Sequence, residues 1–166
     1  MKTGKIARDG MLVAVAFVLS YVESLLPLSF GVPGIKPGLS NVVVMICLYQ
    51  CSMKETFVVS IVRIVLSGLT FGSISTMLYS LAGGMLSLLV MYFLKKSQKF
   101  SVYGVSMTGG VFHNIGQILV AILILKTALL IYYLPALLLA GVASGILVGI
   151  LAGILEKRLH PFFLEV

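Results

Sequence analysis

Long apolar stretches separated by short polar segments account for most of this chain. A helix that crosses the hydrocarbon core of a bilayer needs about 20 mostly apolar residues, because each residue adds about 1.5 Å to its length. Apolar residues make up 60% of the chain and charged residues 10%, with a mean hydropathy of +1.15, which excludes a soluble surface. We therefore predict an all-α membrane protein with a single transmembrane domain over residues 1–166. Its six crossings are expected near residues 10–28, 38–51, 55–71, 75–94, 103–125 and 129–155.

The second and third predicted crossings are short, and the polar patch at residues 52–55 leaves open a hairpin that does not fully cross. The positions of the basic residues favour full crossings. With six crossings and a cytoplasmic start, the inside loops carry Lys2, Lys5, Arg8, Lys54, Lys95, Lys96, Lys99, Lys157 and Arg158, and the outside loops carry Lys36 and Lys126. We therefore expect both termini in the cytoplasm. Topology accounts for the basic net charge, so the charge gives no support for nucleic acid as a partner.

A cleaved signal peptide is the alternative interpretation of the first apolar segment, because a basic start precedes it. The segment continues through Leu25, Leu26 and Leu28 without a clear small-residue cleavage site. Its removal would also upset the charge distribution between the two sides of the membrane. We therefore favour a retained first crossing.

Small residues recur at four-residue intervals in the first and last crossings. Such spacing aligns them on one helix face, where another backbone can approach closely. The residues are Gly10 and Ala14 near the start of the chain and Gly141, Gly145, Gly149 and Gly153 in the last crossing. Packing within the bundle is one explanation for these faces, and docking of a separate membrane subunit is the other. Spacing alone does not distinguish them.

The segment at residues 27–38 contains three prolines and three glycines, which exclude a continuous helix. With the expected topology it lies on the outer side of the membrane. It either covers a cavity that opens outward or merely reverses the direction of the chain.

Charged and hydrogen-bonding side chains within the apolar segments are the candidate substrate-binding residues, since such groups are costly in a bilayer. Arg63 and His113 are expected near the middle of the membrane, and the others lie further outward, so that one cavity can receive them. The set is Glu23, Asn41, Arg63, Tyr79, His113, Asn114 and Gln117. A buried arginine can hold a carboxylate or phosphate by paired hydrogen bonds. The alternative is a purely structural ion pair between Arg63 and Glu23.

Four segments carry a resemblance to a known family: Leu19–Ser24 (LSYVES), Pro33–Asn41 (PGIKPGLSN), Tyr79–Gly84 (YSLAGG) and Gly109–Gln117 (GGVFHNIGQ). Through them the chain resembles the Gx transporter family, whose members are often labelled heptaprenyl diphosphate synthase component I. That family is similar to the substrate-binding S components of energy-coupling factor (ECF) transporters. The resemblance extends over nearly the whole chain, and the last of the four segments is its most specific part.

The resemblance implies two different functions. An S component binds a small vitamin-like molecule and works with a transmembrane coupling protein and two ATPase subunits. The other label implies an accessory role in prenyl diphosphate metabolism. Catalysis by this chain is not expected, because prenyl diphosphate synthases hold magnesium with clustered aspartates and this chain has only Asp9. It also lacks a phosphate-binding loop for nucleotide.

We therefore expect a substrate-binding subunit of a bacterial cell membrane, with six crossings and an S-component-like bundle. Its substrate is a small vitamin-like or isoprenoid-linked molecule, and its surroundings are the lipid bilayer. No cofactor is expected. Cys47 and Cys51 have helix-packing spacing and no histidine or carboxylate nearby in sequence, so no metal site is expected either.

Overall fold

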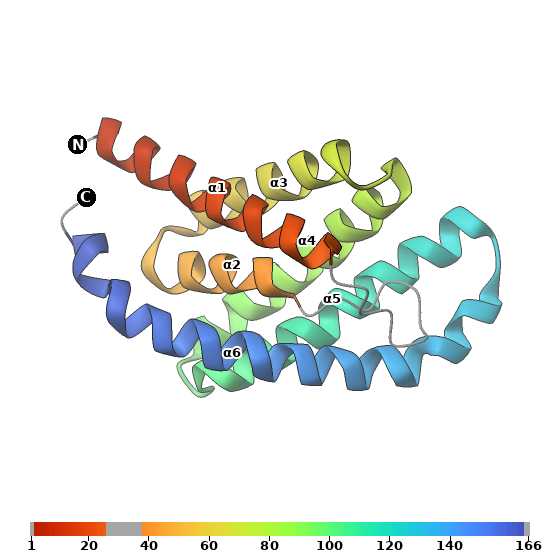
Figure 1. The fold of residues 1–166 in the computed structure, drawn as a ribbon. Coiled ribbons are helices and arrows are strands. Elements are labelled where there is room, and N and C mark those ends of the chain that lie inside the picture. The colour runs from red at the N-terminus through yellow and green to blue at the C-terminus, as the bar shows by residue number, and fades with distance from the viewer. Residues whose placement is uncertain (1, 26–37, 165–166) are drawn as a thin grey trace.

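The computed structural model describes residues 2–25 and 38–164. Over these residues the chain is almost entirely helical and contains no strand, which confirms the predicted all-α class and the six α-helices (Figure 1). The elements are α1 (Lys2–Leu25), α2 (Leu39–Gln50), α3 (Met53–Thr70), α4 (Ile74–Ser97), α5 (Val102–Leu125), the 3-10 helix η1 (Ala128–Tyr133) and α6 (Leu134–Leu164). The loop predicted at residues 27–38 lies outside the described residues, except for Gly38.

The ends of the helices extend beyond the apolar stretches or are set by caps. Helix α1 begins at Lys2 and α6 continues to Leu164, because helical hydrogen bonding does not require an apolar side chain. Helix α3 begins at a capping box: the Glu55 backbone N–H donates to Ser52 Oγ at 3.3 Å, and the Ser52 backbone N–H donates to Glu55 Oε2 at 2.8 Å. The polar patch at residues 52–55 is therefore the N-cap and the first turn of α3.

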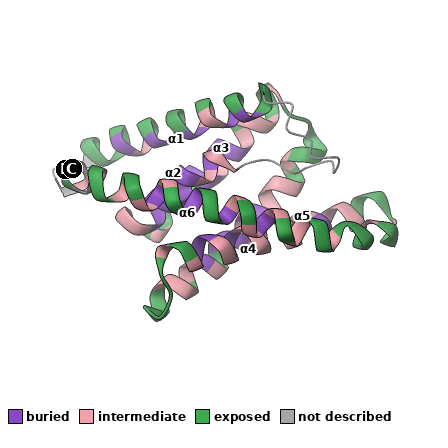
Figure 2. Ribbon diagram, turned by 60° about the horizontal axis from the view of Figure 1, so that its bottom comes forward, coloured by how far each residue is buried: buried purple, intermediate pink, exposed green. Residues whose placement is uncertain are grey.

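Helix α2 lies at the centre of the bundle. Eight of its twelve residues are buried, and it packs against α1, α3 and α6. Figure 2 shows the buried residues concentrated on α2 and on the inward faces of its neighbours. At about 1.5 Å per residue α2 is about 18 Å long, shorter than the roughly 30 Å core of a bilayer. Because most of its residues are buried, the apolar side chains of α2 contact other helices rather than lipid.

The outer surface is apolar, as a bundle surrounded by lipid requires. Large apolar side chains such as Leu123, Leu139 and Ile154 are exposed there. Three segments are long and apolar enough to cross a membrane: α4, α5 and Ala128–Leu159. Helices α1 and α3 carry charged residues within their length, among them Glu23 and Arg63. A soluble protein would not leave apolar patches of this extent in water, so the chain is a membrane protein.

The glycine face of α6 packs against α5. A Cβ at Gly145 would lie 2.6 Å from Met107 Cα, and one at Gly141 would lie 2.8 Å from the Gly110 carbonyl oxygen. Gly149 faces the same helix, and the Cβ position of Gly153 is 3.7 Å from the Tyr103 hydroxyl. Of the two explanations that the sequence leaves open, packing within the bundle accounts for these four glycines, because α5 covers their face. Sequence spacing identified the close packing but not the helix that provides it.

The start of α1 and the end of α6 lie at the same end of the bundle (Figure 1). There Arg8 forms salt bridges with Asp9 at 2.9 Å and with Glu55 at 3.1 Å, and its guanidinium lies 5.8 Å from the centre of the Phe163 ring. These contacts join α1, α3 and α6. The location of this end in the cytoplasm stays a prediction.

Candidate binding cavity

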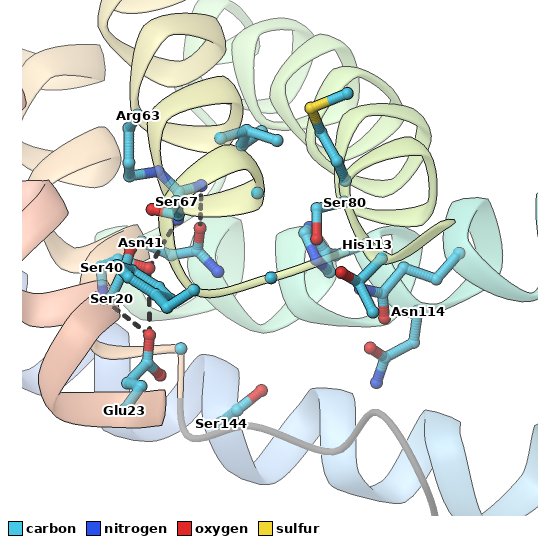
Figure 3. A pocket seen from close by; sticks show the side chains of 18 of the residues that line it. Ser20, Glu23, Ser40, Asn41, Arg63, Ser67, Ser80, His113, Asn114 and Ser144 are labelled. Atoms are coloured by element: carbon cyan, nitrogen blue, oxygen red, sulfur yellow. Dashed lines mark hydrogen bonds between the residues drawn. The ribbon is translucent and has the colours of Figure 1, made fainter. Parts of the chain in front are cut away.

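A polar cavity of about 140 Å³ lies among α1, α2, α3, α4, α5 and α6 (Figure 3). Most of its lining side chains carry hydrogen-bonding groups. They are Ser20, Glu23, Ser40, Asn41, Arg63, Ser67, Thr76, Ser80, His113, Asn114, Gln117 and Ser144, with Ile64, Phe71, Met77 and several glycines between them. Since Gly38, Phe71 and Gly72 mark helix ends opposite the chain termini, the cavity lies in the half of the bundle away from those termini.

Glu23 of α1 holds the start of α2. The N-cap position of α2 is Gly38, which has a φ of +79° and no side chain to accept from the first backbone N–H groups. The Glu23 carboxylate takes that role: Leu39 N–H donates to Oε1 at 2.8 Å and Ser40 N–H donates to Oε2 at 3.4 Å. The negative charge also lies at the positive end of the helix dipole. Glu23 therefore replaces the missing N-cap side chain.

Ser40 connects this carboxylate to Arg63. Its hydroxyl donates to Glu23 Oε2 at 3.1 Å and accepts from Arg63 Nη1 at 2.6 Å. Arg63 Nη2 donates to Asn41 Oδ1 at 3.1 Å. Figure 3 shows the four side chains as one hydrogen-bonded chain along the cavity wall. The salt bridges of the described residues are those of Arg8, so the direct pair of Arg63 with Glu23, the alternative raised from the sequence, is replaced by contact through a hydroxyl.

Two polar atoms on α3 lack hydrogen-bond partners among the described residues. They are Arg63 Nε and Ser67 Oγ, and both are buried. Arg63 as a whole is 7% exposed. Because residues four apart lie on the same helix face, both side chains line one side of the cavity. Buried polar groups are nearly always hydrogen-bonded, so these two atoms mark a candidate position for a ligand or a water molecule.

The opposite wall is formed by α5. It contributes His113, Asn114 and Gln117 to the cavity lining. The Asn114 side chain donates to the Leu137 carbonyl oxygen at 2.6 Å, so its amide nitrogen serves the packing of α5 against α6. One N–H of the amide and its oxygen are left for a ligand.

Glycines bring α4 against this wall. A Cβ at Gly83 would lie 2.5 Å from the His113 carbonyl oxygen, and one at Gly116 would lie 2.8 Å from Gly83 Cα. This close backbone approach fixes the position of His113 and Gln117 relative to α4.

The structure thus brings six of the seven predicted residues to one cavity: Glu23, Asn41, Arg63, His113, Asn114 and Gln117. Tyr79 is not part of the lining, so its position does not support the predicted role in substrate binding.

The residues that sequence reasoning missed are mainly serines, and Ser40 and Ser67 are the most important of them. A serine in an apolar helix usually bonds to its own backbone, as Ser20 does to the Ala16 carbonyl oxygen, so it gives no distinct signal.

The groups that line the cavity are suited to binding a small ligand. Among the described residues no group of three His, Cys, Asp or Glu side chains is placed to hold a metal ion. The cavity offers one guanidinium, several hydroxyls, amides and an imidazole. These groups recognise a small ligand through directional hydrogen bonds and charge.

Fold and cavity together define a helical membrane protein with a polar cavity lined by its helices. A family model described as heptaprenyl diphosphate synthase component I matches residues 12–155, and the chain belongs to that family. No curated protein matches the chain, and no solved structure matches it.

Proposed function

We propose that this protein is the substrate-binding membrane subunit of an ECF-type transporter, and that it takes up a small vitamin-like or isoprenoid-linked molecule. The observation that carries the proposal is the polar cavity in an otherwise apolar bundle, with a buried arginine whose bonding capacity is partly unused. Burying such groups is costly in a membrane, so a bound ligand provides the reason for keeping them.

Each part of the cavity has a role in this proposal. Arg63 binds the charged or most polar group of the substrate, while His113 and Gln117 form directional hydrogen bonds from the opposite wall. Glu23 and Asn41 hold the arginine in position, Glu23 through Ser40 and Asn41 directly. With the termini in the cytoplasm, the cavity opens toward the outside, where an uptake protein meets its substrate.

A docking face for a coupling protein is available on α1. Gly10 and Ala14 are exposed, and a Cβ at Gly10 would meet no atom within 4 Å. Small side chains allow another transmembrane helix to approach closely. The partners in this proposal are a membrane coupling protein and two ATPase subunits, because this chain has no nucleotide-binding loop of its own.

The test is native mass spectrometry of the protein after gentle extraction from its bacterial host membrane, combined with substrate uptake by whole cells. Copurified ATPase subunits and a bound small molecule support the proposal. Arg63→Ala and His113→Ala are expected to weaken binding of that molecule in a folded protein, whereas Ser97→Ala, at an exposed helix end, leaves it unchanged. Unchanged affinity in both cavity variants contradicts the assignment.

The second candidate is a non-catalytic accessory subunit of a prenyl diphosphate synthase, and the family description favours it. The single aspartate and four glutamates of the chain do not form the aspartate-rich motif with which such enzymes bind magnesium diphosphate, so we propose no catalysis by this chain. Here the same experiment gives a copurified soluble synthase and a bound prenyl compound. That result overturns the transporter proposal.

A further inference from the structure

The electrostatics of the cavity depend on what neutralises Glu23. Its carboxylate accepts from two backbone N–H groups at the start of α2 and from the Ser40 hydroxyl. The partial positive charge at that helix end provides a further favourable contribution. Glu23 is therefore stabilised by α2 and does not form a direct ion pair with the arginine.

Arg63 is consequently a buried cation whose direct protein partners are uncharged. Of the five N–H donors of a guanidinium, one is donated to the Ser40 hydroxyl and one to the Asn41 amide oxygen. Its Nε makes no hydrogen bond to the described residues. A cation in a low-dielectric interior is strongly stabilised by an anion in contact with it. The cavity is where that anion can bind.

Ser67 adds a second, independent indication. It lies one helical turn beyond Arg63 on α3, lines the same cavity, and its buried Oγ has no partner among the described residues. An oxygen of a ligand that accepts from both Arg63 Nε and Ser67 Oγ satisfies both orphan groups. A neutral carbonyl group satisfies the hydrogen bonds but leaves Arg63 without an anion in direct contact, because Glu23 reaches it only through the Ser40 hydroxyl.

We infer that the substrate carries an oxyanion, a carboxylate or a phosphate, and that Arg63 Nε and Ser67 Oγ form its binding subsite. The inference rests on the proposed function, which it makes more specific. The remainder of the substrate faces the imidazole and amide groups of α5, and the polar lining requires that this part also form hydrogen bonds. A purely hydrocarbon group would leave those lining groups unpaired.

The experiment uses the whole chain, labelled with ¹⁵N-arginine and reconstituted in lipid nanodiscs. The chain contains three arginines, Arg8, Arg63 and Arg158, so three Nε–H signals are expected, and Arg63→Lys assigns the one that disappears. Inorganic phosphate and acetate are titrated at constant ionic strength, and acetamide serves as the neutral counterpart of acetate. The Arg8 and Arg158 signals are internal controls for general salt effects.

We expect the Arg63 Nε–H signal to shift and saturate with at least one of the two anions, and not with acetamide. Ser67→Ala raises the half-saturating anion concentration about tenfold, as loss of a hydrogen bond to a charged group does. Ser67→Thr, which keeps the hydroxyl, retains the affinity, as does Ser87→Ala, a buried serine that does not line this cavity.

Three results overturn the inference: no saturable shift at Arg63, an equal shift with acetamide, or equal anion affinity in Ser67→Ala and the unaltered protein. Its failure is separable from failure of the transporter proposal. ATPase subunits that copurify with a neutral bound molecule refute the oxyanion subsite alone. An anion bound at Arg63 in a protein that copurifies with no ATPase and supports no uptake refutes transport alone.

Discussion

Glu23 and Arg63 lie on either side of the Ser40 hydroxyl, which donates to the carboxylate at 3.1 Å and accepts from the guanidinium at 2.6 Å. One small side chain therefore connects the only two buried charges that line the described cavity. Because Ser40 is itself 3% exposed, water does not readily replace its hydroxyl.

Ser40→Ala is expected to lower the free energy of unfolding by about 1–3 kcal/mol, since it leaves a buried charged donor without its acceptor. Chemical unfolding in detergent, followed by far-ultraviolet circular dichroism, measures the change. Ser97→Ala is the control, because that hydroxyl is exposed and bonds only locally to the Leu94 carbonyl oxygen. Equal stability of the two variants contradicts the bridging role.

Removal of the Glu23 carboxylate is expected to loosen the first turn of α2. In Glu23→Ala the backbone N–H groups of Leu39 and Ser40 lose their acceptors, and their amide hydrogens exchange faster, by about tenfold or more for a loss of about 1–3 kcal/mol. Glu23→Gln keeps one acceptor oxygen, so its exchange rate is expected to lie between those of the unaltered protein and Glu23→Ala. Hydrogen exchange read by mass spectrometry on peptides covering the start of α2 tests this.

Glu156 provides the matched control for that measurement, because its carboxylate accepts from the Gln50 side chain at the other end of α2. Glu156→Ala is expected to leave exchange at the start of α2 unchanged. If Glu23→Ala also leaves it unchanged, the carboxylate does not cap the helix.

Alanine substitution at two glycines of the same α6 face is expected to change the stability of the protein in different ways. A Cβ at Gly145 meets Met107 Cα at 2.6 Å, so Gly145→Ala forces two backbones apart and costs about 1–3 kcal/mol. At Gly153 the nearest atom is 3.7 Å away, so Gly153→Ala is neutral or stabilises by up to about 1 kcal/mol through helix propensity. The two variants are compared by their thermal unfolding midpoints, measured in the same detergent. Equal shifts for the two variants contradict the observed packing of α5 on α6.

The sequence predicted the fold well because apolar length is a strong signal. Six helices and their approximate centres follow from the positions of the apolar stretches, whereas the polar extensions of α1 and α6 do not, since hydropathy reports only their apolar part. The meeting of Glu23, Arg63 and His113 at one cavity followed from their depth along the helices.

The details of the cavity were not predictable in the same way. The roles of Ser40 and Ser67 depend on which helix faces which, and a serine in an apolar helix has several ordinary partners. Asn114 was expected to face a ligand, yet its amide nitrogen bonds to the Leu137 carbonyl oxygen of α6. Contacts between helices that are distant in sequence determine which partner such a polar side chain bonds to. The local pattern of a single sequence does not show these contacts.

The stability of the bundle is expected to depend on Arg8, which joins helices at the end where the chain termini lie. Its side chain is 5% exposed and bonds to Asp9 and Glu55, so Arg8→Met leaves two carboxylates without their partner and is expected to cost about 1–3 kcal/mol. Lys99→Met, at an exposed position between α4 and α5, is the control and is expected to change stability by less than about 0.5 kcal/mol.

Glu55 also accepts from the Ser52 backbone N–H in the capping box of α3, so its own substitution removes two interactions. A double-mutant cycle of Arg8→Met with Glu55→Gln isolates the ion pair from the cap. We expect a coupling energy of about 1 kcal/mol at low salt, and a smaller one at 1 M salt because Glu55 is partly exposed and therefore screened. A coupling energy of zero at low salt means that the ion pair has no part in joining α1 to α3. The stabilisation by Arg8 then comes from its other contacts, among them the Phe163 ring of α6.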